Sequence, residues 1–80
     1  MSAVTEPKLN WGAFGEFVRQ ARKKSGMTQT DLADAIRRDQ SDISSIERGV
    51  LQPTFETAAR LANALGVKFS KLCVILETAN

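Results

Sequence analysis

Hydrophobic residues recur every three or four positions once the chain passes residue 10, a spacing typical of helices with one buried face. The first such stretch carries basic side chains on its opposite face. Gly26 follows it and supplies a stop signal, because glycine readily takes the left-handed backbone that ends many helices. We predict a first helix whose inward residues include Trp11, Phe14, Val18 and Ala21.

Two short helices are predicted in the middle of the chain, separated by a break at IRRD. Thr28 is a favourable N-cap for the first of them, and Asp39 is one for the second. Ala33 is small enough to let another helix approach closely, and Gly49 ends the second helix. The residues expected to point inward are Leu32, Ala35 and Ile36 from the first helix and Ile43 and Ile46 from the second.

A fourth helix is predicted between the N-cap Thr54 and the stop signal Gly66, and a fifth over SKLCVILET, beginning near Ser70. The inward residues of the fourth helix are expected to be Phe55, Ala58, Ala59, Leu61, Ala62 and Leu65. The chain has no run of alternating apolar and polar residues bounded by hairpin turns, so we predict no strand. The expected fold is therefore an all-α, compact bundle of five helices over residues 11–78, preceded by a flexible arm over residues 1–10.

Composition excludes several kinds of function. A chain of 80 residues holds one domain with a marginal core. It has no histidine and only one cysteine, Cys73, so we expect no metal site, no disulfide within the chain and no cofactor. Without histidine, tyrosine or a glycine-rich phosphate loop, an enzyme has almost no support. No signal peptide or membrane span is recognisable, and a single thiol suits the cytoplasm.

The distribution of charge gives weak support for nucleic-acid binding. The net charge is only +2, but Arg19, Arg22, Lys23 and Lys24 fall close together, whereas acids are spread through the middle of the chain. A cluster this small is usually only a solvated face. More specific is the central pair of short helices joined by a turn of three or four residues, which is typical of DNA-binding helix-turn-helix units.

Three segments together resemble the Xre/Cro helix-turn-helix family, whose members have lambda-repressor-like DNA-binding domains. They are VRQARKKSGMTQTDLADAI, SDISSIERG and QPTFETAARLANALGV, and the resemblance covers about sixty of the 80 residues in order, without insertion. It implies that the helix from Thr28 to about Ile36 positions the domain. The helix over residues 40–48 would then be the recognition helix, laid in the major groove of double-stranded DNA.

The resemblance also implies residue roles. Gln29 would contact a phosphate, and Gln40 and Ser41 would contact bases, because a glutamine amide can bond adenine at two positions. Arg22 and Glu47 match a family pair that forms a salt bridge and would aim Arg22 at the DNA backbone. The full set of candidate DNA-binding residues is Arg22, Thr28, Gln29, Arg37, Arg38, Gln40, Ser41, Ser44, Ser45 and Arg48.

Some positions depart from the family pattern. Arg37 stands where glycine is usual, because the turn there favours a left-handed backbone, and Arg38 stands where an apolar residue is usual. Both arginines have either moved next to DNA phosphates or are solvated charges on a turn; the two interpretations are equally supported. Val50 and Leu51 replace basic residues in the loop after the recognition helix and would pack against a partner subunit or leave phosphate contact to the arginines.

The fifth helix is apolar on nearly all sides, which an 80-residue monomer cannot cover. We expect a homodimer through it, as the family also implies, with two recognition helices about 34 Å apart. The alternative is a frayed, exposed tail. Cys73 is expected to be a small core residue. The expected interface residues are Leu72, Val74, Ile75 and Leu76.

Together these features predict a sequence-specific DNA-binding transcription regulator that acts as a homodimer on an inverted-repeat operator. A phage repressor, a restriction-modification controller protein and an antitoxin all fit this description. The rival interpretation is a protein-interaction module that keeps the fold and binds a protein such as a toxin or a polymerase. The polar face formed by Gln40, Ser41, Ser44 and Ser45 argues against it, because protein-binding grooves favour aromatic or aliphatic anchors.

Overall fold

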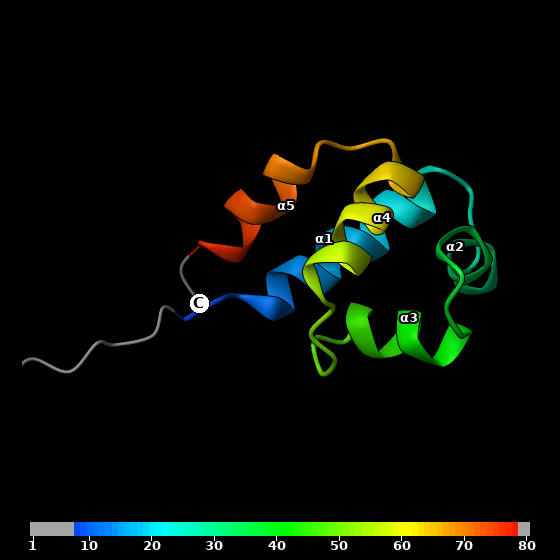
Figure 1. Cartoon of the computed structure of the whole chain (residues 1–80), viewed down its shortest axis with the longest axis horizontal. Coiled ribbons are helices and arrows are strands. Elements are labelled where there is room, and N and C mark those ends of the chain that lie inside the picture. The colour runs from blue at the N-terminus through cyan, green and yellow to red at the C-terminus, as the bar shows by residue number, and fades with distance from the viewer. Residues whose placement is uncertain (1–7, 79–80) are drawn as a thin grey trace, which may run out of the picture.

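The computed structural model describes residues 8–78 of the chain. Within this range the chain forms five α-helices and no strand, which confirms the all-α class expected from the hydrophobic spacing. The helices are α1 (Trp11–Lys24), α2 (Gln29–Ile36), α3 (Gln40–Glu47), α4 (Phe55–Leu65) and α5 (Phe69–Leu76) (Figure 1). Residues 1–7 of the expected N-terminal arm lie outside the described residues.

The helix α1 forms the centre of the bundle, because it packs against α3, α4 and α5, while α2 packs against α3 and α4. In Figure 1, α3 lies on one side of α1 and α4, and α5 lies on the other. One continuous core joins all five helices. Its buried apolar residues are Phe14, Val18, Leu32, Ala33, Ile36, Ile43, Ile46, Ala58, Leu61, Ala62, Leu65 and Leu72.

Asn10, the last residue of the expected arm, forms hydrogen bonds with the start of α1 and with the end of α5. Its side chain caps α1 by accepting the backbone N–H of Ala13 at 2.9 Å. Its own backbone N–H donates to the carbonyl of Leu76 at 2.8 Å, and its side-chain amide donates to the hydroxyl of Thr78 at 3.3 Å. These bonds join the start of α1 to the end of α5.

Two of the predicted N-caps are confirmed. The hydroxyl of Thr28 accepts the backbone N–H of Asp31 at 3.0 Å, and the Asp31 carboxylate accepts the backbone N–H of Thr28 at 2.9 Å, forming a capping box. This backbone hydrogen bond holds the pKa of Asp31 below its usual range. Thr54 caps α4 by accepting the backbone N–H of Thr57 at 3.2 Å.

The prediction for Asp39 is only half right. Asp39 occupies the N-cap position of α3 with an extended backbone, but its carboxylate makes no capping hydrogen bond. Its backbone carbonyl accepts the N–H of Asp42 at 3.0 Å. At the N-cap position itself, the start of α3 is therefore capped through the backbone and not through the Asp39 side chain.

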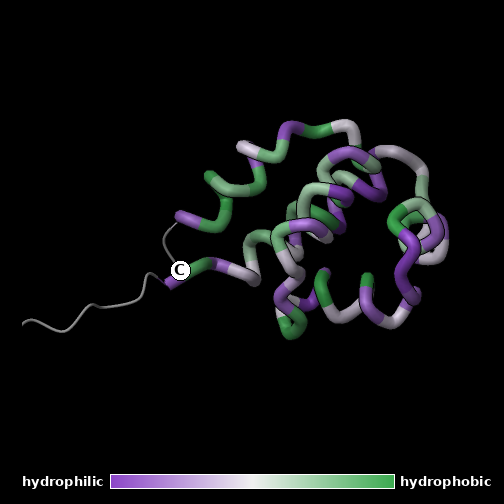
Figure 2. Tube along the Cα trace, viewed as in Figure 1, coloured by the Kyte–Doolittle hydropathy of each residue, from purple (hydrophilic) through white to green (hydrophobic). Residues whose placement is uncertain are grey.

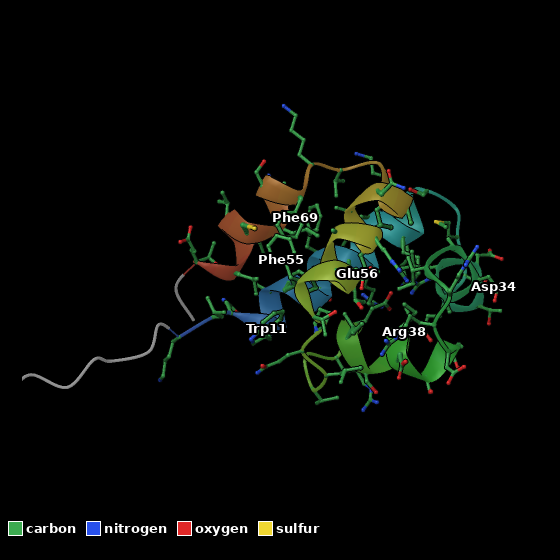
Figure 3. The ribbon with its side chains drawn as sticks, viewed as in Figure 1. Trp11, Asp34, Arg38, Phe55, Glu56 and Phe69 are labelled. Carbon is green, nitrogen blue, oxygen red and sulfur yellow. The ribbon has the colours of Figure 1, made fainter. Side chains whose placement is uncertain are left out.

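Two inward-facing predictions are wrong. Ala35, expected to point inward, is exposed, because α2 is packed between α3 and α4 and turns its Leu32–Ala33–Ile36 side toward both. The burial of Ala33 fits the expectation that another helix approaches it closely. Phe55, expected in the core, is 77% exposed. It is the first residue of α4, and its ring packs against that of Phe69 with centroids 4.7 Å apart (Figure 3).

The structure corrects the predicted start of the fifth helix and the predicted position of Leu72. α5 begins at Phe69, one residue before the predicted start, without a side-chain cap from Lys68. Leu72, expected at a dimer interface, has no exposed surface and belongs to the core. The reason is the packing of α5 against both α1 and α4, which covers this side of the helix. Val74 is 59% exposed, and Ile75, Leu76 and Cys73 are half-buried.

Gly15 sets the distance between α1 and α3. Gly15 is buried in the middle of α1, where glycine is normally unfavourable. A Cβ atom built on it would lie 2.3 Å from the carbonyl oxygen of Ile46 and 2.6 Å from that of Glu47. The backbones of the two helices therefore touch here, and the C-terminal end of α3 is held directly on α1.

Candidate nucleic-acid interface

Residues 37–39 form the turn between α2 and α3. Arg37 has φ 59° and ψ 46°, which is the left-handed conformation expected at this position. It is the only non-glycine residue with a positive φ within residues 8–78. The turn therefore keeps the geometry that usually calls for glycine and tolerates the steric cost of a side chain, about 1–2 kcal/mol.

A buried ion pair fixes α3 to α1, as the family resemblance implied. Nε and Nη2 of Arg22 donate to the two carboxylate oxygens of Glu47 at 2.6 and 3.1 Å. Nη1 of Arg22 donates to the backbone carbonyl of Met27 at 2.9 Å. The hydrogen bonds to Glu47 raise the pKa of Arg22, so the arginine stays charged at every accessible pH.

The ion pair extends by two side-chain amides to the start of α3. Nε2 of Gln29 donates to a carboxylate oxygen of Glu47 at 3.0 Å. The Gln29 carbonyl oxygen in turn accepts a short hydrogen bond from Nε2 of Gln40. A chain of hydrogen bonds thus runs from the buried guanidinium of Arg22 to Gln40 at the first turn of α3, and each amide is oriented by the next.

The remaining surface of α3 is polar, as predicted. Gln40 and Ser41 are exposed at its first turn, and Ser44 and Ser45 are half-buried further along. Ile43 and Ile46, on the opposite side, are completely buried. The helix therefore presents amide and hydroxyl groups outward while its apolar side is fixed in the core. These are hydrogen-bonding groups that can read base edges in the major groove.

The arginines among the candidate DNA-binding residues differ in their exposure and in their ion pairs. Arg37 and Arg48 are exposed, and Arg48 makes only a long contact of 3.4 Å with the hydroxyl of Ser45. Arg38 is paired with Asp42 at 3.1 Å, and Figure 3 shows it near the start of α3. Arg22 is only 8% exposed, and its guanidinium is used in the ion pair with Glu47. Its expected contact with phosphate remains a prediction.

Thr28 and Gln29 lie at the N-terminal end of α2, beside the start of α3. Thr28 is exposed, but its hydroxyl is used in the capping box. Both polar atoms of the Gln29 side-chain amide are engaged: the nitrogen donates to Glu47, and the oxygen accepts from Gln40. Sequence reasoning assigned Gln29 to a phosphate and missed its bonds to Glu47 and Gln40. The signal that could have found them was the presence of two glutamines at the starts of adjacent helices.

The loop after α3 differs from the polar surface beside it. Val50 is 68% exposed, whereas Leu51 is half-buried and packs against the core. Their backbone N–H groups both donate to the carbonyl of Ser45, at 3.0 and 3.2 Å. Figure 2 shows the hydrophobic tip of this connection between α3 and α4. Leu51 is therefore part of the fold, and Val50 alone is left as an unexplained exposed apolar group.

Residues 8–78 lack two other kinds of functional feature. No group of three or more histidine, cysteine, aspartate or glutamate side chains in this range is arranged to hold a metal ion. None of the helices in this range combines the length and apolar character that a membrane crossing requires.

Comparison with known proteins places this geometry in a family. The family model described as "Helix-turn-helix" matches residues 18–72, more than half of the chain. An uncharacterized HTH-type transcriptional regulator of Methanothermobacter thermautotrophicus is 37% identical over 60 residues, which cover 75% of this chain and 87% of that protein. Multiprotein-bridging factor 1 of Eremothecium gossypii is 34% identical over 65 residues, or 81% of this chain, but the match spans only 43% of its length.

Solved structures of regulators have the same fold. The restriction-modification controller protein C.AhdI from Aeromonas hydrophila superposes with a TM-score of 0.75 at 28% identity, over 79% of this chain and 96% of that one. The biofilm master regulator SinR, solved in complex with DNA, superposes with a TM-score of 0.70 at 28% identity, over 75% of this chain and 97% of that one. The buried pair, the two central helices and these likenesses agree: the chain belongs to the helix-turn-helix family of transcription regulators, of the Xre-like kind that its sequence resembles.

Proposed function

We propose that this protein is a sequence-specific regulator that binds double-stranded DNA as a homodimer, with the N-terminal half of α3 in the major groove. The observation that carries the proposal is the orientation of Gln40. Its side chain is exposed at the first turn of α3 and is held by Gln29, which is held by the buried carboxylate of Glu47. A pre-oriented amide loses little freedom when it bonds a base, which favours specific readout.

Exposed basic and polar groups around this amide suit the DNA backbone. Ser41 is exposed beside Gln40, and Arg37 and Arg48 are exposed beyond the two ends of α3. Side chains of these types contact phosphates in protein–DNA complexes and fix the register of the recognition helix. The likeness to SinR, which was solved with DNA, supports the same role for this chain.

Exposed apolar residues support the homodimer. Val74 is 59% exposed on α5, and its neighbours Ile75 and Leu76 are only half-buried. Figure 2 shows that the second half of α5 is strongly hydrophobic. A second copy of the chain would cover these side chains and would place two α3 helices on one face of DNA. An inverted repeat is the operator that such a symmetric dimer reads.

The experiment that tests this function is selection from random double-stranded DNA at near-physiological salt. We expect an enriched inverted repeat whose half-site centres are about ten base pairs apart, or a multiple of that. The absence of enrichment, with affinity that falls uniformly as salt rises, would indicate backbone contact alone and would refute sequence-specific regulation.

The second candidate function is a protein-interaction module. Val50 and Phe55 favour it, because they are 68% and 77% exposed and apolar, and α4 begins directly after the loop that carries Val50. The same selection experiment separates the two functions, since a module that does not read DNA enriches no sequence.

A further inference from the structure

A shallow apolar groove runs along the side of the bundle formed by α1, the α4–α5 connection and α5. One part has a volume of about 630 Å³ and is lined by apolar side chains from α1 and α4 together with Val67. A second part of about 570 Å³ continues along α5 toward Val74. Both parts contain Phe17 and Val67, so they form one continuous surface, hereafter the lysine groove.

Four lysines give this groove its name and its charge. They are Lys23 and Lys24 at the end of α1, Lys68 before α5 and Lys71 within it. All four are exposed, and none of them forms an ion pair with an acidic side chain within residues 8–78. No aspartate or glutamate lines either part of the groove. The floor is therefore apolar and the rim is uniformly positive.

We propose that the lysine groove binds an acidic amphipathic helix of a partner protein. The apolar side of such a helix, with anchors spaced three and four residues apart, would lie on Phe17 and Val67. Its carboxylates would meet the lysines on the rim, and this charge complementarity is what selects an acidic partner. Nucleic acid does not suit this groove, because a phosphate backbone gains nothing from an apolar floor.

The position of the groove makes this binding compatible with DNA. α5 and α3 lie on opposite sides of α1 and α4, so the groove does not share the surface of α3 (Figure 1). A partner in the groove would therefore be carried on the DNA-bound protein. The proposal does not depend on which sequence the DNA has, or on whether the reading of bases is specific.

The test uses a fluorescently labelled helical peptide of about 18 residues, or five turns, with leucine at the anchor positions and glutamate elsewhere. We expect saturable binding to the full chain by fluorescence anisotropy, with amide shifts in ¹⁵N spectra confined to the groove, around Phe17, Ala21, Val67 and Ser70. The double variant Lys24→Glu/Lys71→Glu should weaken binding by roughly tenfold, because two exposed charge pairs become repulsive. A peptide with glutamine in place of glutamate should bind both proteins alike.

The matched control is Arg37→Glu/Arg60→Glu, which makes the same change of net charge away from the groove. We expect it to weaken the peptide by less than about twofold, and a DNA duplex should not displace the peptide. Equal loss in the two double variants, or shifts on α3, would show attraction to the DNA-binding surface and would overturn the proposal. Absence of binding would overturn it as well.

A second copy of the chain is the remaining occupant to exclude, because Val74 lies both at the end of the groove and in the proposed dimer face. Sedimentation of Lys24→Glu/Lys71→Glu should give the same mass as the unsubstituted protein. A change in the number of protein chains per particle, caused by the peptide or by the variant, would mean that another copy fills the groove, and the partner-helix proposal would then be wrong.

Discussion

At the residue scale, the side chain of Glu47 links three helices through hydrogen bonds with Arg22 of α1 and Gln29 of α2. It accepts two hydrogen bonds from Arg22 and one from Gln29, and its side chain is 2% exposed. It therefore joins the core to the exposed polar start of α3 through one carboxylate and the Gln29 amide. Residues with this many buried polar partners are costly to remove, because each partner is left unsatisfied.

The first prediction concerns this carboxylate. Glu47→Ala should lower the free energy of unfolding by about 3–5 kcal/mol, because it leaves the charge of Arg22 buried without a partner. Asp34→Ala, at an exposed position of α2, is the control and should change it by less than about 0.5 kcal/mol (Figure 3). Urea denaturation measures both. Equal midpoints for the two variants would contradict the importance of the buried pair.

Gly15 gives the second prediction. Gly15→Ala should destabilise the protein by roughly 1–3 kcal/mol, although alanine is the better helix former, because its Cβ would collide with the backbone carbonyls of α3. Gly12→Ala in the same helix is the control. The nearest atom to its Cβ, Oδ1 of Asn10, is 3.6 Å away, so a gain of about 0.5–1 kcal/mol is expected. A stabilised Gly15→Ala would show that α1 and α3 can separate at little cost.

Arg37 gives the third prediction, which separates its two interpretations. Arg37→Gly should raise the free energy of unfolding by about 1 kcal/mol by relieving the left-handed backbone. If Arg37 contacts a phosphate, the same variant should also reduce the slope of log affinity against log salt by about 0.9 for each subunit, or about 1.8 for the proposed dimer. An unchanged slope would identify Arg37 as a solvated charge. A loss of stability would show that its side chain is held by contacts that offset the strain.

At the element scale, α3 is an eight-residue helix with one side buried in the core and the other side exposed and polar. Ile43 and Ile46 fix it in the core, while Gln40 and Ser41 start the exposed polar side. So short a helix is not stable alone, and its stability comes from packing. The contact at Gly15 and the Arg22–Glu47 pair therefore determine where its exposed residues point.

The fourth prediction concerns the reading of bases by this helix. Gln40→Ala should reduce discrimination at one base pair of each half-site by about 1–3 kcal/mol and leave non-specific affinity nearly unchanged. Gln20→Ala is the control, because Gln20 lies on α1 and bonds only Glu16 among described side chains. Affinities for matched and mismatched duplexes measure the effect. Uniform weakening across all sequences would show that Gln40 contacts phosphate instead.

At the scale of the whole molecule, the polar and apolar surfaces lie on different elements. α3 carries hydrogen-bonding groups, while α5 and the start of α4 carry exposed apolar ones. This separation would let one protein bind DNA through one side and other protein chains through another, as proposed. A small core gains stability from a second copy, so assembly and folding would be linked in this chain.

The fifth prediction tests that assembly. Ile75→Asp should give a monomer where the proposed dimer is expected for the unsubstituted chain, because a carboxylate would be buried without a partner at the proposed interface. Asn63→Asp, at an exposed position of α4, introduces the same charge and should leave the mass unchanged. Sedimentation measures both. An unchanged mass for Ile75→Asp would remove this part of α5 from the interface.

The periodic pattern alone predicted five helices, their order, and the N-caps Thr28 and Thr54. These features depend on local spacing and capping chemistry, which neighbouring residues determine. The resemblance implied the pairing of Arg22 with Glu47, which is present. At position 37, where the family usually has glycine, the turn could have been reshaped, but it keeps the left-handed backbone with arginine. The individual DNA and dimer contacts remain predictions.

Tertiary structure decided what local pattern could not. It exposed Ala35 and Phe55 and covered Leu72, because each outcome depends on which other helices pack against that side. It also brought Gln29 and Gln40, eleven positions apart, into one hydrogen-bonded chain with Glu47. Spacing along a chain specifies the faces of a helix, but only the packing of helices in three dimensions determines which face is covered and which side chains meet.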